Sequence, residues 1–182
     1  NKKVVTNMSA YETRAVIIAT GTENKILGVP GEKEFLGKGV SYCAVCDGNF
    51  FKEQDVVVIG GGNSALEEAL YLADICKSVT IVHRRQEFRA EKYIVDNVVK
   101  KDNITLELDS VLEEITGEEL VDTVKVKNVV TGDLKFISTK GVFIYVGLKP
   151  ITSPFEDLNI LDENNNLDVN IGKKIIERFF EN

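Results

Sequence analysis

Residues 55–65 read D-V-V-V-I-G-G-G-N-S-A, an apolar run that leads directly into three glycines. A continuous run of valine and isoleucine is typical of a strand that is buried on both faces of a parallel sheet. The glycines predict a tight turn, and the apolar spacing that follows them predicts a helix over residues 63–75. This stretch therefore indicates a strand, a turn and a helix that packs back over its own sheet.

The sequence after residue 75 repeats this alternation. Buried strands are predicted at residues 79–82 and 104–108, with a second helix at residues 90–101 between them. The resulting β-α-β-α-β order, with short connections, is that of a doubly wound (Rossmann-like) parallel sheet, so the predicted fold class is α/β.

Segments of a different kind flank this unit. Residues 110–138 alternate apolar and polar side chains, which predicts an antiparallel β-meander insertion with one face in solvent. Residues 141–147 return to the buried parallel type. Near the start of the chain two strands are predicted, one at residues 2–6 and a buried one at residues 14–20.

The composition limits the kinds of partner. The 182 residues carry a net charge of −7, so neither a nucleic-acid partner nor a membrane surface is expected. No apolar run approaches the ~18 residues of a membrane span. The first residues lack the apolar core of a signal peptide, so a cytoplasmic location is expected. Three cysteines are an odd count, which favours a redox or metal role over a structural disulfide framework.

The glycine turn matches a nucleotide-binding pattern. Gly60, Gly62 and Ala65 fit G-x-G-x-x-G/A, in the strand-to-helix context that this motif requires. Gly60 permits the turn, Gly62 lets a pyrophosphate approach the backbone, and Ala65 lets helix and strand pack closely. The backbone N–H groups of Asn63 and Ser64 favour an anion at the helix start. We predict a dinucleotide site, the alternative being a glycine turn in another α/β fold.

The end of the second strand indicates which dinucleotide binds. NAD sites usually place an acidic residue about 20 residues after the fingerprint, where it bonds the ribose 2′-hydroxyl. Here that place holds His83, Arg84 and Arg85, with Arg89 shortly after them. Guanidinium groups bind a 2′-phosphate through paired charge-assisted hydrogen bonds. NADPH is therefore predicted over NADH, the alternative being a solvated basic patch.

The pair Cys43 and Cys46 admits several interpretations. Two cysteines at this spacing can form a disulfide, and the motif commonly lowers the pKa of one thiol. Zinc is a rival, because Cys76 and His83 would complete a nominal set of four ligands. Nearby arginines disfavour a divalent cation there, so no metal site is predicted, and Cys76 is expected to be part of the core. Two inert buried cysteines are the other alternative, which the polar turn at Asp47 and Gly48 disfavours. Asp47 follows the pair and is placed to act as an acid toward a departing thiolate or a reduced flavin.

These segments together resemble the bacterial-type, low-molecular-weight thioredoxin reductases over about residues 2–168. The resemblance rests on I-I-A-T-G at 17–21, L-G-V-P-G-E at 27–32, G-V-S-Y-C-A-V-C-D-G at 39–48, V-V-I-G-G-G-N-S-A-L-E-E-A at 57–69, H-R-R-Q-E-F-R-A at 83–90 and V-F-I-Y-V-G-L-K-P at 142–150.

The resemblance implies that Cys43 and Cys46 form a redox-active disulfide with Asp47 as its acid. It also implies a homodimeric flavoprotein in which electrons pass from NADPH through FAD to this disulfide and on to thioredoxin. Thr20 and Gly21 match a segment that passes close to the flavin.

The resemblance further implies a division of the chain. Residues 1–37 correspond to one edge of an FAD domain, and residues 38–148 to the NADPH-binding domain with its cysteine pair. Residues 149–182 correspond to the return into the FAD domain and a divergent tail. From the sequence itself, residues 170–180 of this tail indicate a short amphipathic helix. The family carries two glycine fingerprints and this sequence contains one. The chain is therefore expected to be an incomplete form that binds NADPH without retaining FAD.

Other functions remain open from the sequence. One is a nucleotide-binding module without turnover of its own. Another is the flavoprotein subunit of an alkyl hydroperoxide reductase, which typically prefers an unphosphorylated cofactor. A third is a ferredoxin–NADP reductase, a class that lacks the paired cysteines.

Overall fold

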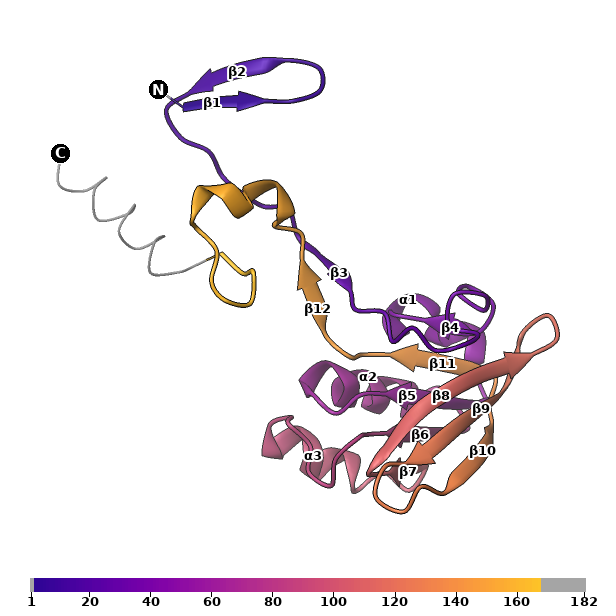
Figure 1. Cartoon of the computed structure of the whole chain (residues 1–182). Helices are drawn as coiled ribbons and strands as arrows, with labels where there is room; N and C mark the ends of the chain where they lie inside the picture. The colour runs from indigo at the N-terminus through magenta and orange to yellow at the C-terminus, as the bar shows by residue number, and fades with distance from the viewer. Residues whose placement is uncertain (1, 168–182) are drawn as a thin grey trace. The chain divides into compact units, whose positions relative to one another are not determined.

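The computed structural model describes residues 2–167 (Figure 1). Those residues fall into two compact units, one made of residues 2–23 and 148–167 and the other of residues 24–147. The helix predicted for residues 170–180 lies outside the described residues. Among the described residues, no helix combines the length and the apolar character that crossing a membrane would need.

A five-stranded parallel sheet forms the centre of the larger unit. Its spatial order is β4-β11-β5-β6-β7, and every neighbouring pair is parallel. The strands are β4 (Val40–Ser41), β5 (Asp55–Ile59), β6 (Ser78–Val82), β7 (Ile104–Glu107) and β11 (Gly141–Ile144). The parallel sheet predicted from the apolar runs is confirmed.

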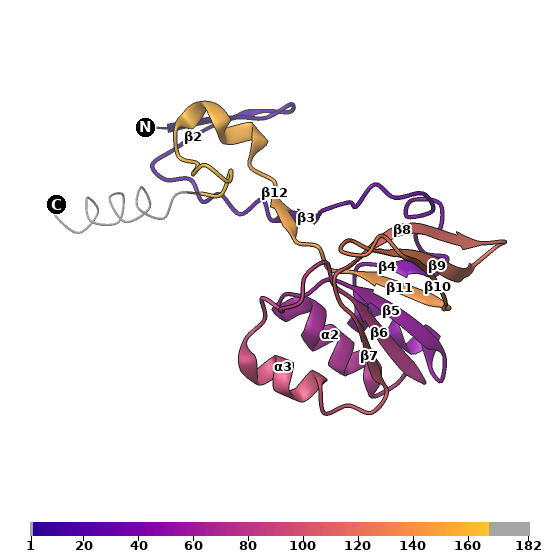
Figure 2. The ribbon, with the colours of Figure 1, turned by 60° about the horizontal axis from the view of Figure 1, so that its bottom comes forward.

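The two faces of this sheet carry different covers (Figure 2). One face is covered by α2 (Asn63–Ala73) and α3 (Lys92–Val98). The other is covered by the antiparallel meander of β8 (Ser110–Gly117), β9 (Val121–Asn128) and β10 (Leu134–Ser138). The predicted meander is therefore confirmed, and it occupies the sheet face opposite the helices.

The residues of β5 from Val56 to Ile59 are all apolar because both faces of this strand are buried. Val56 and Val58 pack into the core beneath the helices, whereas Val57 and Ile59 pack into the core beneath the meander. Successive side chains of a strand point to opposite faces, so a strand covered on both faces must be apolar throughout.

The smaller unit consists of short elements. Strand β1 (Lys2–Val5) pairs with β2 (Ala10–Thr13) in an antiparallel hairpin. Strand β3 (Thr22–Asn24) pairs with β12 (Leu148–Pro150), and a 3-10 segment covers Ser153–Leu158. The expectation that these pieces belong to an FAD domain stays a prediction.

The buried strand predicted at residues 14–20 is wrong. No regular structure forms there, and the side chain of Ile17 is 92% exposed. A buried strand needs hydrogen-bonded neighbours and a cover on each face. Within residues 2–167, no strand pairs with this segment.

The second helix is shorter than predicted, because α3 begins at Lys92 instead of residue 90 and ends at Val98. The backbone N–H of Arg89 donates to the carbonyl oxygen of Gly61 (2.8 Å), and that of Glu91 donates to Asn63 Oδ1 (2.9 Å). These bonds hold the preceding residues in an irregular loop against the glycine turn.

Candidate functional site

The glycine turn lies at the carboxyl end of β5, where α2 begins. Gly60 has φ +149°, in a region that side chains rarely adopt. A Cβ on Gly60 would lie 2.5 Å from the carbonyl oxygen of Tyr145 and 2.8 Å from the Cβ of Ala65. The close packing predicted for Gly60 and Ala65 is therefore present in the structure.

Gly62 borders open space, because a Cβ there would meet no atom within 4 Å. It is the N-cap residue of α2, so the backbone N–H groups of Asn63 and Ser64 lie in the first turn. These N–H groups have no intrahelical acceptor and carry the positive end of the helix dipole. This side of the turn can thus accept an anion.

The three arginines lie together in the loop between β6 and α3. Arg84, Arg85 and Arg89 are all exposed. Within residues 2–167, none of them forms an ion pair with a carboxylate. The hydrogen bond from the Arg89 N–H to Gly61 fixes this loop directly against the glycine turn.

His83 lies beneath this loop and is only 7% exposed. Its ring stacks on Phe88 with centroids 5.3 Å apart, and its Nε2 lies 3.1 Å from the carbonyl oxygen of Glu87. Burial lowers the pKa of His83, and the neighbouring arginines lower it further, against the opposing effect of the Glu87 carbonyl. A neutral ring thus packs between the arginine loop and Gly61, where any Cβ would come within 2.2 Å of His83 Nδ1.

Cys43 and Cys46 form a disulfide with Cα atoms 5.3 Å apart. The bond closes the first turn of α1 (Ala44–Asp47), for which Cys43 is the N-cap residue. The N–H of Cys46 donates to Cys43 Sγ at 3.2 Å. Cys46 is exposed and Cys43 half-buried, so at least one sulfur is open to attack by an external thiolate.

Tyr145 connects the disulfide to the glycine turn. Its hydroxyl accepts a hydrogen bond from the N–H of Ala44 at 2.7 Å, and its carbonyl oxygen faces Gly60. Burial raises the pKa of Tyr145 well above its usual range, and the Glu68 and Asp47 carboxylates add to this effect. The hydroxyl therefore stays neutral. Nothing in the sequence indicated this contact, which joins residues 101 positions apart.

The zinc alternative finds no ligand set in the described part of the chain, which holds no group of three or more His, Cys, Asp or Glu side chains suited to a metal ion. The sulfurs of Cys43 and Cys46 are bonded to each other. Cys76 is buried, and burial raises the pKa of its thiol to about 11. It packs with the apolar residues between the helices and the sheet, as predicted.

The two residues expected near a flavin lie in the smaller unit, and both are exposed. Thr20 Oγ1 donates to the carbonyl oxygen of Ile151 at 2.5 Å, and the N–H of Ile151 donates to the carbonyl oxygen of Gly21 at 3.0 Å. These bonds hold Thr20 and Gly21 beside the strand pair of β3 and β12.

Comparisons with known proteins find similar sequences over most of the chain. The model of the family described as "Pyridine nucleotide-disulphide oxidoreductase" matches residues 1–173. A thioredoxin reductase of Rickettsia typhi is 49% identical over 158 residues, which are 85% of this chain and 51% of the relative. One from Bacillus subtilis is 45% identical over 93% of this chain and 54% of the relative.

Solved structures give the same result. A crystal structure of Lactococcus lactis thioredoxin reductase superposes with a TM-score of 0.85 at 46% identity, covering 91% of this chain and 55% of that one. The thioredoxin reductase of T. acidophilum gives a TM-score of 0.84 at 43% identity, covering 91% of this chain and 55% of that one. The chain spans about half the length of the relatives it matches.

Proposed function

The chain belongs to the pyridine nucleotide-disulphide oxidoreductase family, and we propose that it serves the NADPH-dependent reduction of thioredoxin through the Cys43–Cys46 disulfide. The observation that carries this proposal is the linkage of three parts. Tyr145 joins the disulfide helix to the glycine turn, and the Arg89 N–H joins that turn to the arginine loop. Such a reaction needs an accessible disulfide at one end and, at the other, a basic loop free to bind a phosphate. Within residues 2–167 the arginines of this loop form no ion pair with a carboxylate.

NADPH fits the residues at the nucleotide end. The open space at Gly62 admits a pyrophosphate, and the N–H groups of Asn63 and Ser64 would donate to it. The guanidinium groups of Arg84, Arg85 and Arg89 would bind the 2′-phosphate. His83 would support this loop from below through its stacking on Phe88. When bound, NADPH supplies the hydride for the reduction.

FAD is the proposed carrier between nucleotide and disulfide in a flavin-complete form. Thr20 and Gly21 are the only residues that we assign to it here. The described residues contain no second glycine turn that opens a helix, so they do not fit an FAD pyrophosphate by themselves. A cytoplasmic homodimer is the form that we propose for the complete protein, on the basis of its resemblance to the named thioredoxin reductases.

The disulfide end would react by thiol exchange. Once the pair is reduced, a thiolate of Cys43 or Cys46 attacks one sulfur of the thioredoxin disulfide, that bond breaks, and the departing sulfur needs a proton. The second cysteine then attacks the mixed disulfide, which releases reduced thioredoxin and restores the Cys43–Cys46 bond. Asp47 ends α1 directly after Cys46. We assign to it the supply of that proton, as a general acid.

Two glycine substitutions are expected to distinguish effects on NADPH affinity from effects on the stability of the fold. Gly62→Ala should change the free energy of unfolding by less than about 1 kcal/mol, because its new methyl group meets no protein atom. It should nevertheless weaken NADPH binding at least about tenfold, because the methyl group occupies the space of the pyrophosphate. Titration with NADPH and thermal unfolding of the same samples check both expectations.

The matched variant is Gly61→Ala, whose methyl group would collide with the ring of His83. It should destabilise the fold by about 1–3 kcal/mol, as overpacking does. Equal effects of the two variants on stability would contradict this account of the turn.

The 182-residue chain should bind NADP(H) and remain colourless after incubation with FAD. A flavin held only near Thr20 and Gly21 lacks a helix N-terminus for its phosphates. Visible absorption spectra with and without added FAD, followed by an assay of NADPH oxidation with thioredoxin present, test this. Bound flavin with sustained turnover would show that a second glycine turn is dispensable.

A further inference from the structure

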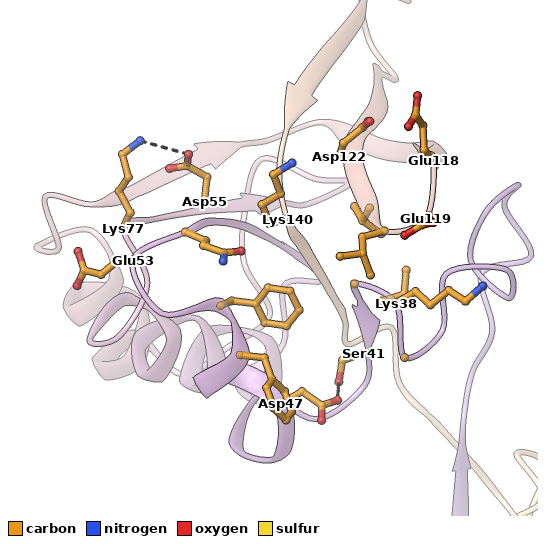
Figure 3. A pocket seen from close by; sticks show the side chains of 18 residues that line it. Lys38, Ser41, Asp47, Glu53, Asp55, Lys77, Glu118, Glu119, Asp122 and Lys140 are labelled. Atoms are coloured by element: carbon orange, nitrogen blue, oxygen red, sulfur yellow. Dashed lines mark hydrogen bonds and ion pairs between the residues drawn. The ribbon is translucent and has the colours of Figure 1, made fainter.

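Ser41 lies at the centre of a small hydrogen-bond network that includes the backbone of Cys43, and Figure 3 shows its bond to Asp47. It ends β4, two residues before Cys43, and is only 5% exposed. Its hydroxyl donates to Asp47 Oδ2 at 2.6 Å. The N–H of Cys43 donates to Ser41 Oγ at 3.0 Å, and the carbonyl oxygen of Cys43 lies 3.3 Å from the same Oγ. One hydroxyl thus contacts both the proposed acid and the backbone of the first cysteine.

A hydroxyl group can form a hydrogen bond with either protonation state of a carboxyl group, because the hydroxyl has one O–H donor and two acceptor lone pairs. When Asp47 is ionised, the Ser41 O–H donates to its carboxylate. When Asp47 is protonated, its own O–H can donate to Ser41 Oγ, and the serine proton can turn to the Cys43 carbonyl. Both protonation states are then satisfied while the heavy atoms stay in place.

Ser41 and Asp47 also line a cavity of about 970 Å³ in the larger unit. Figure 3 shows the pair at one end of this cavity. The cavity gives water a route to Asp47, so a proton that Asp47 has donated can be replaced from solvent.

We propose that Ser41 is a positioning residue that holds Asp47 beside the disulfide in both of its protonation states. This inference rests on the proposed acid role of Asp47. In the step concerned, an attacking thiolate bonds to one sulfur of the disulfide, the Cys43–Cys46 bond breaks, and the departing sulfur takes the proton of Asp47. A dithiol reductant supplies the two electrons and is oxidised to its own disulfide.

The test uses the 182-residue chain, reduced by excess dithiothreitol at pH 7. The rate is measured by rapid quenching and by counting labelled thiols at Cys43 and Cys46 by mass spectrometry. Asp47→Asn should slow the reduction about 100-fold, the lower end of the range for general acid catalysis. Ser41→Ala should slow it about fivefold.

A matched pair isolates the hydroxyl. Threonine and valine have nearly the same shape and differ in that valine carries a methyl group where threonine carries its hydroxyl. The Ser41→Thr variant should therefore react at least about threefold faster than the Ser41→Val variant. Ser78→Ala is the control for losing a serine–aspartate hydrogen bond elsewhere, because Ser78 Oγ donates to Asp55 Oδ1 at 2.7 Å. Its reduction rate should equal that of the unmodified chain, and thermal unfolding verifies that each variant is folded.

The outcomes distinguish this inference from the function on which it rests. If Asp47→Asn is slow while Ser41→Ala and Ser41→Val react at the unmodified rate, the role of Ser41 is refuted and that of Asp47 stands. Equal rates for the threonine and valine variants would also refute it. An unmodified rate for Asp47→Asn would overturn the acid assignment, and the inference with it.

Discussion

Replacement of Cys43 or Cys46 by serine is expected to abolish thioredoxin reduction in a flavin-complete form of the protein. Thiol–disulfide exchange needs one sulfur to attack and a second to resolve the mixed disulfide. The two residues form a single disulfide, so neither has a substitute within the site. The loss should appear as the absence of thioredoxin-dependent NADPH oxidation, while NADPH binding remains.

Cys76→Ala provides the matched control. This thiol is buried, and burial raises its pKa to about 11, so hardly any reactive thiolate forms at neutral pH. Activity should persist in this variant even if its melting temperature falls. Full activity in either serine variant, or stoichiometric zinc in the unmodified protein, would overturn the assignment of the cysteine pair.

Replacement of Arg84 and Arg85 by alanine is expected to weaken NADPH binding strongly and to leave NADH binding almost unchanged. Within residues 2–167 the two side chains are exposed and form no ion pair, and they belong to the loop that the Arg89 N–H fixes against the glycine turn. Each lost hydrogen bond to a charged group costs about 1.5–3 kcal/mol, which is about one to two decades of affinity. Titration of the 182-residue chain with each nucleotide measures the difference.

Arg14→Ala is the control for the loss of one exposed positive charge in the other unit. It should leave both affinities within about twofold of the unmodified values, because Arg14 belongs to neither the glycine turn nor the arginine loop. Equal losses for NADPH and NADH in the double variant would show that Arg84 and Arg85 do not read the 2′-phosphate.

The fold of the parallel sheet and its helices could be predicted because each element has its own apolar pattern, and each pattern is long enough to identify a strand or a helix. The apolar runs of β5 and β6 and the spacing of α2 each follow from burial on a defined face. The run at residues 14–20 shows the limit of that reasoning. Its residues are those of a buried strand, yet burial depends on neighbouring strands, and among residues 2–167 this segment has none.

The candidate site could be predicted in its residue types but not in its connections. The cysteine spacing and the glycine pattern are sequence signals, whereas the four-residue helix α1 is too short to leave a periodic pattern. Ser41 and Tyr145 are common residue types, and their importance comes from contacts with Asp47 and Ala44. The burial of His83 could not be predicted either. The sequence around His83 is compatible with a ring that faces solvent and with one that packs against Gly61, as it does in the structure.

The central claim is that electrons from NADPH reach the Cys43–Cys46 disulfide. It is tested most directly by anaerobic titration of a flavin-complete form with NADPH, followed by alkylation of new thiols and their location by mass spectrometry. The account predicts that one equivalent of NADPH produces two alkylated thiols, at Cys43 and Cys46, and that NADH at the same concentration produces few. Oxidation of NADPH that leaves this disulfide intact would contradict the account.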